Sequence, residues 1–225
     1  MAVIHRTTME PGKLQLLAAW LPTRPWYTGT GAPELARAGG FRLDDPEGEV
    51  GMEFMVVTDT SGDAPVAYHV PVTYRGAPLD GAGEALVGTS EHGVLGRRWV
   101  YDGAQDPVLI AQLLALLRGR AVPQAQSLSD TPDPSVVVSE APAGLAAVAA
   151  SGTTREGKHG TDIVLDATAD DEVPVTLGVR RVLLPGDPGA GDDDADVLGH
   201  VTAGWSLPEG REIRGPFAIL GRGPR

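Results

Sequence analysis

Residues 50–75, VGMEFMVVTDTSGDAPVAYHVPVTYR, decide the fold class of this 225-residue chain. From Val66 to Arg75, apolar residues alternate with mixed ones, which is the period of a half-buried β-strand. Residues 50–58 have the apolar composition of a second strand, and the turn-forming residues 61–63 lie between the two. We therefore predict an antiparallel hairpin. Pro71 cannot donate a ladder hydrogen bond and so predicts a sheet edge or a bulge.

Elements on either side of this hairpin follow from similar signals. Residues 85–89 and 97–101 predict a second hairpin, with its turn at residues 92–96. A short helix is predicted from Pro11 to Leu21, because apolar residues recur on one face until Pro22 stops the run. A second helix is predicted after Asp106, with Pro107 in its first turn and Gly119 just after its end.

The remaining segments suggest how the chain is divided. Residues 22–46 are rich in Pro and Gly and are predicted to form a loop, with a turn of helix possible at 34–38. We expect a first domain over residues 1–122, a linker over 123–135 and a smaller β-rich region over 136–225. Within that region, strands are predicted at 136–138, 145–150, 162–167, 173–184, 199–207 and 213–220, with a Gly/Asp-rich loop at 185–196.

Composition and charge exclude several classes of protein. The formal net charge is −12, so neither nucleic acid nor an anionic membrane surface is an expected partner. The chain has no cysteine and therefore no disulfide or thiolate chemistry. No apolar run reaches the roughly 20 residues of a bilayer span, and no signal peptide is recognisable. We expect a cytoplasmic protein.

Two short motifs have partial matches to known ligand-binding loops. Gly152, Gly157 and Lys158 have the spacing of a phosphate-binding loop, but His159 replaces the hydroxyl residue and a strand follows in place of a helix. A glycine-rich hairpin turn explains these residues better. Asp192, Asp194 and Asp196 alternate as in a calcium loop, but Val197 and Ala203 occupy the positions of the required Gly and Glu. We expect no metal site and no cofactor.

Residues 86–108, LVGTSEHGVLGRRWVYDGAQDPV, together with residues 21–27, LPTRPWY, resemble the N-terminal cap domain of the actinobacterial maltokinases and the related glucosamine kinases. The resemblance covers about residues 1–120, and the second half resembles the β-rich intermediate subdomain of that family more loosely. It implies an α+β fold, with a cystatin-like curved antiparallel sheet, packed helices and a smaller β-rich subdomain.

The family's phosphotransfer needs a catalytic-loop Asp and metal-binding residues. None of the His residues here has an Asp two positions later, so we expect no kinase-type catalytic loop. The resemblance therefore implies a noncatalytic accessory or regulatory protein of trehalose or α-glucan metabolism, which binds a protein partner or a saccharide. The alternatives are a subunit of a sugar phosphotransferase, a glucan-acting enzyme with an unrecognised carboxylate pair, or a purely structural module.

The aromatic and basic residues of the two quoted segments have two interpretations. In the first, Trp99 and Tyr101 fill the core of the sheet and Gly93 and Gly96 shape the turn. Arg97 and Arg98 lie on either side of the strand, and one of them pairs with a nearby carboxylate. In the second, a surface patch binds a partner or an α-glucan, because carbohydrates stack on aromatic rings and arginine binds hydroxyls or carboxylates. The candidate residues of this patch are Arg24, Trp26, Tyr27, His92 and Arg98.

Overall fold

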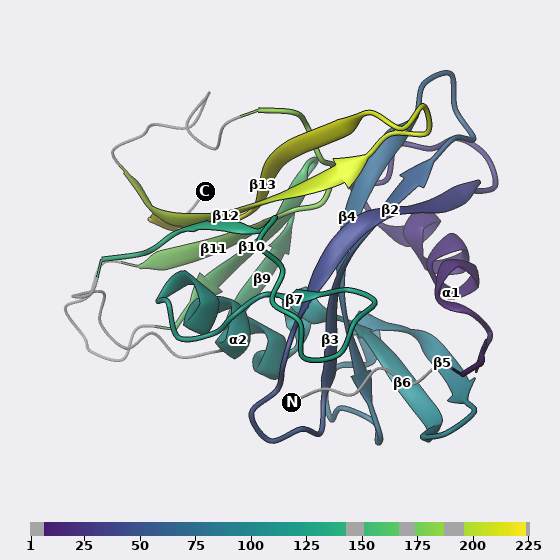
Figure 1. Ribbon diagram of the computed structural model, residues 1–225, viewed down its shortest axis with the longest axis horizontal. Helices are drawn as coiled ribbons and strands as arrows, with labels where there is room; N and C mark the ends of the chain where they lie inside the picture. The colour runs from purple at the N-terminus through teal and green to yellow at the C-terminus, as the bar shows by residue number, and fades with distance from the viewer. Residues whose placement is uncertain (1–6, 143–150, 167–173, 187–195, 224–225) are drawn as a thin grey trace.

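The computed structural model describes residues 7–142, 151–166, 174–186 and 196–223, and its main feature is one antiparallel sheet (Figure 1). Thirteen strands within the described residues join this sheet, in the order β1-β5-β6-β4-β3-β2-β12-β13-β11-β10-β9, with β7 beside β2 and β8 beside β12. Strands from the two halves of the chain meet where β12 pairs with β2. The strands are β1 (Met9–Glu10), β2 (Leu35–Leu43), β3 (Gly51–Asp59), β4 (Val66–Arg75), β5 (Leu86–His92), β6 (Gly96–Asp102), β7 (Gln124–Ala125), β8 (Val137–Ser139), β9 (Gly152–Glu156), β10 (Gly160–Leu165), β11 (Val175–Arg180), β12 (Val197–Ser206) and β13 (Glu212–Arg222).

The β3–β4 hairpin predicted from the sequence is confirmed, with Gly51 opposite Tyr74 and Asp59 opposite Val66. Pro71 lies inside the sheet rather than at an edge. The backbone N–H of His69 points away from β3, to the carbonyl of Arg181, so the nitrogen of Pro71 two residues later points the same way. It falls where β4 changes neighbours, because pairing with β6 begins only at Val72. The missing donor therefore interrupts no ladder.

Two α-helices lie in the described part of the chain, α1 (Lys13–Trp20) and α2 (Pro107–Leu117), and both were predicted. The Asp106 side chain caps α2 by accepting a hydrogen bond from the Val108 N–H at 2.9 Å. Gly119, with φ of 65°, follows its end, as expected for a residue in the left-handed region. Neither helix is long and apolar enough to cross a membrane.

The helices cover different faces of β3 (Figure 1). Met52, Phe54 and Val56 belong to the core that contains α2, whereas Met55 and Val57 belong to the core that contains α1. Because successive side chains of a strand point to opposite faces, a strand covered on both sides is apolar almost throughout. The core around α2 also includes residues of β10 to β13, so it joins the two halves of the chain.

The loop predicted at residues 22–46 is wrong over Leu35–Leu43, which forms β2 between β3 and β12. The helical turn predicted at 34–38 is also wrong. Gly39 and Gly40 weaken the strand signal in the sequence. The geometry of the strand nevertheless requires glycine at both positions. A Cβ atom on Gly40 would lie 2.1 Å from the carbonyl oxygen of Phe54, and both glycines have positive φ beside a bulge.

The fold class expected from the resemblance needs correction. An α+β fold with a cystatin-like sheet and packed helices was expected, but the chain is 46% strand and 15% helical, and its sheet is mostly antiparallel. The difference arises because segments predicted as loop form strands, and because the strands of the second half extend the same sheet rather than forming a separate β-rich body. The domain boundaries at 122 and 135 stay a prediction.

Most strands predicted in the second half exist with shifted ends, as β8, β10, β11, β12 and β13. The hairpin-turn interpretation of the glycine-rich motif is confirmed. Gly157 donates its N–H to the Gly160 carbonyl at 2.8 Å, and this turn joins β9 to β10. The strand predicted at 145–150 and most of the loop predicted at 185–196, with Asp192 and Asp194, lie outside the described residues.

Candidate functional site

The five residues singled out from the sequence lie in two separate places. Arg24, Trp26 and Tyr27 follow α1, and Trp26 and Tyr27 pack with the core around that helix. His92 and Arg98 belong to the β5–β6 hairpin and line a cavity that the other three do not line. The structure therefore does not bring the five together.

Trp26 is part of the core. Its side chain is 0% exposed, and its ring lies 5.8 Å from Trp20 and 5.9 Å from Tyr68. An aromatic ring must present a face to solvent before a ligand can stack on it. In this conformation Trp26 stabilises the packing of α1 against β4 and offers no binding surface.

Arg24 and Tyr27 lie at the margin of the same core. The Arg24 guanidinium is 4.9 Å from the centre of the Trp20 ring, a cation–π contact. The Tyr27 hydroxyl donates a hydrogen bond to Asp59 at 2.7 Å. Burial, together with the neighbouring Asp59 carboxylate, raises the pKa of Tyr27 to about 12. Both side chains thus have structural partners within the protein.

The turn of the β5–β6 hairpin is organised by His92. Its Nδ1 atom accepts hydrogen bonds from the backbone N–H groups of Leu95, at 3.0 Å, and Val94, at 3.3 Å. Arg98 donates through Nη2 to the carbonyl of Leu95. His92, Leu95 and Arg98 are thereby held together at one wall of the cavity.

The core interpretation of residues 97–101 holds in part. Tyr101 is buried, with 3% of its surface exposed, and its hydroxyl accepts a hydrogen bond from the Leu79 N–H at 2.9 Å. Arg97 pairs with Glu91 at 2.8 Å on the surface. Trp99 is half-buried rather than in the core.

A cavity of about 590 Å³ opens between the N-terminal segment, the β2–β3 connection and the β5–β6 hairpin. Small-molecule sites in proteins commonly have volumes of roughly 300–1,000 Å³. The lining combines apolar side chains with many polar ones. Its charged and hydrogen-bonding side chains are Thr7, Lys13, Arg37, Arg42, Asp45, Glu49, Glu53, Tyr74, His92, Arg98 and Gln126.

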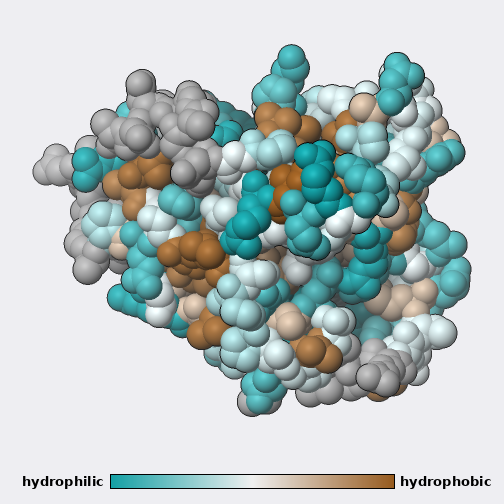
Figure 2. All heavy atoms as spheres, turned by 45° about the horizontal axis from the view of Figure 1, so that its top comes forward, coloured by the Kyte–Doolittle hydropathy of each residue, from teal (hydrophilic) through white to brown (hydrophobic). Residues whose placement is uncertain are grey.

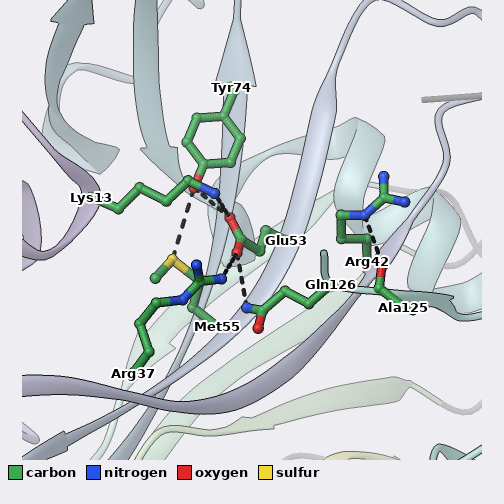
Figure 3. A network of polar contacts seen from close by, with 8 residues as sticks. All are labelled: Lys13, Arg37, Arg42, Glu53, Met55, Tyr74, Ala125 and Gln126. Atoms are coloured by element: carbon green, nitrogen blue, oxygen red, sulfur yellow. Dashed lines mark hydrogen bonds and ion pairs between the residues drawn. The ribbon is translucent and has the colours of Figure 1, made fainter. Parts of the chain in front are cut away.

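Glu53 of β3 is the centre of this lining (Figure 3). Its side chain is 3% exposed, and donors from four other segments converge on its two oxygens. Lys13 of α1 and the Tyr74 hydroxyl, at 2.7 Å, bind Oε2. Arg37, at 3.2 Å, and Gln126, at 2.8 Å, bind Oε1. One buried carboxylate therefore holds together α1, three neighbouring strands and the segment after β7.

The pKa values of Glu53 and Tyr74, which are in contact, are shifted in opposite directions. Burial alone would raise the pKa of Glu53, but the charge of Lys13, the hydrogen bonds from Lys13 and Tyr74, and the charge of Arg37 outweigh it, so the pKa is lowered. Burial and the Glu53 charge raise the pKa of Tyr74 well above its ordinary value. At neutral pH the site contains a carboxylate and a neutral phenol.

The rim of the cavity is built by Asp45 and Arg42. Asp45 accepts three backbone N–H bonds, from Glu47 at 3.1 Å, Glu49 at 3.0 Å and Val50 at 2.9 Å, which closes the β2–β3 connection. Arg42 donates to the carbonyl of Ala125 at 3.1 Å and ties the β7 segment to β2, as Figure 3 shows. These contacts place Gln126 beside Glu53.

Glu53 is arranged to hold its neighbours rather than to transfer a proton. A general base needs a free oxygen lone pair within reach of a substrate proton, whereas both oxygens of Glu53 already accept hydrogen bonds. The described residues contain no group of three or more His, Asp and Glu side chains that could hold a metal ion. What the cavity offers a ligand is a set of oriented cations, amide groups and polar oxygens.

The face shown in Figure 2 is mostly hydrophilic, with hydrophobic side chains in separate patches rather than in one continuous area. Large exposed apolar patches mark docking surfaces in many proteins. No continuous apolar area of this kind is seen on this face.

Sequence reasoning missed Glu53, Arg37 and Gln126. The signal for Glu53 was present, because a single carboxylate inside the apolar run of β3 has to find partners when the strand is buried. Arg37 lay in a segment predicted as loop, and Gln126 in a segment predicted as linker. Nothing in the local sequence links either residue to β3.

Comparison with known proteins agrees with the resemblance. A search of curated proteins found no match. Residues 20–106, which run from the last residue of α1 to the cap of α2, match the family model described as the maltokinase N-terminal cap domain. These residues contain β2 to β6, and with them Arg37, Glu53, Tyr74 and both hairpin residues of the cavity wall. Residues 20–106 of this chain are thus similar to the maltokinase N-terminal cap domain.

Proposed function

We propose that this protein is a noncatalytic accessory or regulatory protein of trehalose or α-glucan metabolism, and that it binds a saccharide in the cavity around Glu53. The relation to maltokinase supports the connection to sugar metabolism. The observation that carries the proposal is the buried Glu53 network, which orients donors from separate segments at the wall of a ligand-sized cavity.

A saccharide suits this lining because each of its hydroxyl groups can donate and accept a hydrogen bond. Gln126 and Arg37 offer donors beyond those that reach Glu53, and Glu49, which also lines the cavity, offers a carboxylate acceptor. Planar side chains with paired donors or acceptors bind vicinal hydroxyls well, since two parallel bonds fix the orientation of the sugar. The volume of about 590 Å³ leaves room for more than one sugar ring.

The noncatalytic assignment rests on the state of the carboxylates that line the cavity. Glu53 is ionised, with its oxygens occupied, and the Asp45 oxygens accept backbone N–H groups. Phosphoryl transfer to a sugar hydroxyl requires a base at that hydroxyl and metal ions on the phosphates. Neither of these two buried carboxylates is arranged for such a role, so binding is the activity that we assign.

The test is a thermal-shift series on the purified chain with maltose, trehalose, glucosamine and ATP, followed by calorimetric titration. A ligand that binds the folded state raises the melting temperature in proportion to RT ln(1 + [L]/Kd). We expect a shift with at least one saccharide, and a clear loss of that shift in Gln126→Met. Arg24→Gln, outside the cavity, is the matched control and should behave like the wild type.

Two results would contradict the proposal. If no saccharide changes the melting temperature at millimolar concentration, the cavity is not a sugar site. If the chain alone consumes ATP in the presence of maltose or glucosamine, the noncatalytic assignment is wrong and a phosphotransferase role replaces it.

A further inference from the structure

The sheet has two end strands in the described part of the chain, and they differ in how well their edges are protected. β1 is only two residues long, Met9–Glu10, and Pro11 follows it directly. A short strand and a proline are two of the devices that keep a sheet edge from pairing with another chain. β9, at the opposite end, is five residues long, contains no proline or lysine, and pairs with β10 without a bulge. β9 is therefore the less protected edge.

The backbone groups of alternate β9 residues point away from β10. Gly157 donates its N–H to the other side of the β9–β10 hairpin, and Ser151 accepts an N–H from that side. Because residues that bond to one neighbouring strand recur at every second position, the odd-numbered residues between these two also bond to β10. The even-numbered ones present their N–H and C=O groups outward, where no strand of the described residues lies; they are Gly152, Thr154 and Glu156.

The charged side chains of β9 already face partners within the hairpin. Arg155 lies directly opposite Asp162 of β10, and Oε1 of Glu156 accepts a hydrogen bond from the Thr161 hydroxyl at 3.0 Å. Charges that are compensated in this way repel a second strand less than unpaired ones. Oε2 of Glu156, however, is buried and has no hydrogen-bond partner in the described part of the chain. A donor from outside the chain would stabilise this oxygen.

We propose that β9 pairs with β9 of a second copy of this chain, antiparallel and related by a two-fold axis at Thr154, so that one sheet continues across two molecules. Identical strands that meet at such an axis run antiparallel and make each contact twice, as in most homodimers. The outward N–H and C=O groups of each β9 then gain partners, which is the way in which exposed sheet edges bind extended segments.

The axis at Thr154 is the one that pairs all three outward residues, with Thr154 opposite its own copy and Gly152 opposite Glu156. An axis at Arg155 or at Glu156 would place like charges directly opposite each other, which is destabilising. An axis at Thr153 would leave Glu156 beyond the end of the paired strands. With the axis at Thr154, the hydroxyl of this residue is diagonal to Glu156 of the second copy. Diagonal neighbours are about 7–8 Å apart, within reach of a long side chain, so the hydroxyl can donate to Oε2.

The first test uses the absence of cysteine from the chain. Directly opposite residues of a hydrogen-bonded antiparallel pair have Cα atoms about 5.5 Å apart, within the range of a disulfide. Thr154→Cys should therefore form a disulfide-linked dimer under mild oxidation. Thr153→Cys is the matched control at the adjacent position. It faces Arg155 of the second copy rather than itself and should cross-link roughly tenfold more slowly.

The second test is analytical ultracentrifugation of the wild type and of Thr154→Pro over a roughly hundredfold range of protein concentration. We expect the wild type to shift toward twice the mass of the chain as the concentration rises. Thr154→Pro loses the outward N–H, which removes both hydrogen bonds at the axis but none to β10. This variant should keep the mass of a single chain, whereas Thr153→Ala should follow the wild type.

Three results would overturn the proposal. In the first, Thr154→Cys and Thr153→Cys cross-link at the same rate. In the second, the wild type keeps the mass of one chain at every concentration. In the third, the wild-type dimer persists in Thr154→Pro, which would place the contact elsewhere on the molecule. If circular dichroism shows that Thr154→Pro does not fold, the two cysteine variants still decide, because neither removes a backbone hydrogen bond.

Discussion

Arg181 and Asp102 form an ion pair with neither side chain exposed to solvent, and the Arg181 Nη2 atom lies 2.6 Å and 2.7 Å from the two carboxylate oxygens. Arg181 also donates through Nε to Thr161 at 2.8 Å, and its guanidinium lies 5.2 Å from the centre of the Trp26 ring. Asp102 lies within the matched cap segment and Arg181 outside it. This pair therefore fastens the second half of the chain to the cap.

Removing one member of this pair should destabilise the whole protein. Arg181→Met leaves the Asp102 charge buried without its partner, and we expect a loss of about 3–5 kcal/mol in the free energy of unfolding, measured by urea titration. Arg97→Met, at an exposed pair with Glu91, is the control and should change stability by less than about 1 kcal/mol. Equal losses of unfolding free energy in the two variants would show that the buried ion pair does not stabilise the contact between the two halves of the chain.

The double variant Arg181→Met with Asp102→Leu tests the reason for that loss. When both charges are replaced by apolar groups, no unpaired ion is left, and such replacements are often near neutral. We expect the double variant to recover most of the stability lost in Arg181→Met. A further loss would mean that the contacts with Thr161 and Trp26, rather than the unpaired carboxylate, dominate.

Trp26→Ala separates the core role of this residue from a role in binding. Because the side chain is fully buried, its truncation should cost about 4 kcal/mol, and urea unfolding at neutral pH measures it. Arg24→Ala, at the margin of the same core, should cost under about 1 kcal/mol. An unchanged unfolding midpoint in Trp26→Ala would indicate that the ring lies at the surface. It would then support the hypothesis of a binding patch that contains Trp26.

His69 should make stability depend on pH. It is fully buried, and burial lowers its pKa to about 3, opposed by the hydrogen bond to the Arg180 carbonyl and assisted by the Arg181 charge. Between the ordinary value of 6.5 and about 3, the unfolded chain binds a proton that the folded chain does not. Stability is therefore fully present above pH 6.5 and falls as the pH drops, by on the order of 3 kcal/mol at pH 4.

The measurement for His69 is the difference in unfolding free energy between pH 7 and pH 4. His69→Gln should show a smaller difference than the wild type, because the remaining acidic groups contribute to both proteins alike. His159→Gln, in the exposed turn between β9 and β10, should follow the wild type. A pH profile unchanged by His69→Gln would contradict the assignment.

Glu53→Gln should lower the free energy of unfolding and loosen the side chains that Glu53 holds at the cavity wall. The substitution leaves Lys13 and Arg37 facing each other without the carboxylate, and we expect a loss of about 2 kcal/mol at pH 7. Since the pKa of Glu53 is lowered from 4.5, its contribution is present above that value and is lost as the pH falls through the folded-state pKa. The loss caused by Glu53→Gln should accordingly shrink below pH 4, as followed by urea unfolding; an effect that is constant from pH 7 to pH 3 would argue against an ionised Glu53.

The elements that could be predicted are those whose signals are local. The period of residues 66–75 and the turn residues before them indicated the β3–β4 hairpin, and Asp106 with Pro107 indicated the start of α2. Strand β2 was missed because Gly39 and Gly40 weaken the strand signal, although they permit the close approach of β2 to β3. The candidate binding residues were predicted less well than these elements. Trp26, for example, is buried because of the way α1 packs, which no local signal in the sequence indicates.

The sequence by itself determined the antiparallel hairpins, both helices, the acidic character of the chain and the relation to the maltokinase cap. Only the tertiary structure decided that one sheet contains strands of both halves, that Glu53 gathers Lys13, Arg37, Tyr74 and Gln126, and that Arg181 pairs with Asp102. Periodicity and capping act over a few neighbouring residues, whereas Asp102 and Arg181 are 79 residues apart. Their meeting, and the cavity around Glu53, depend on the order and register of the strands, which no local pattern specifies.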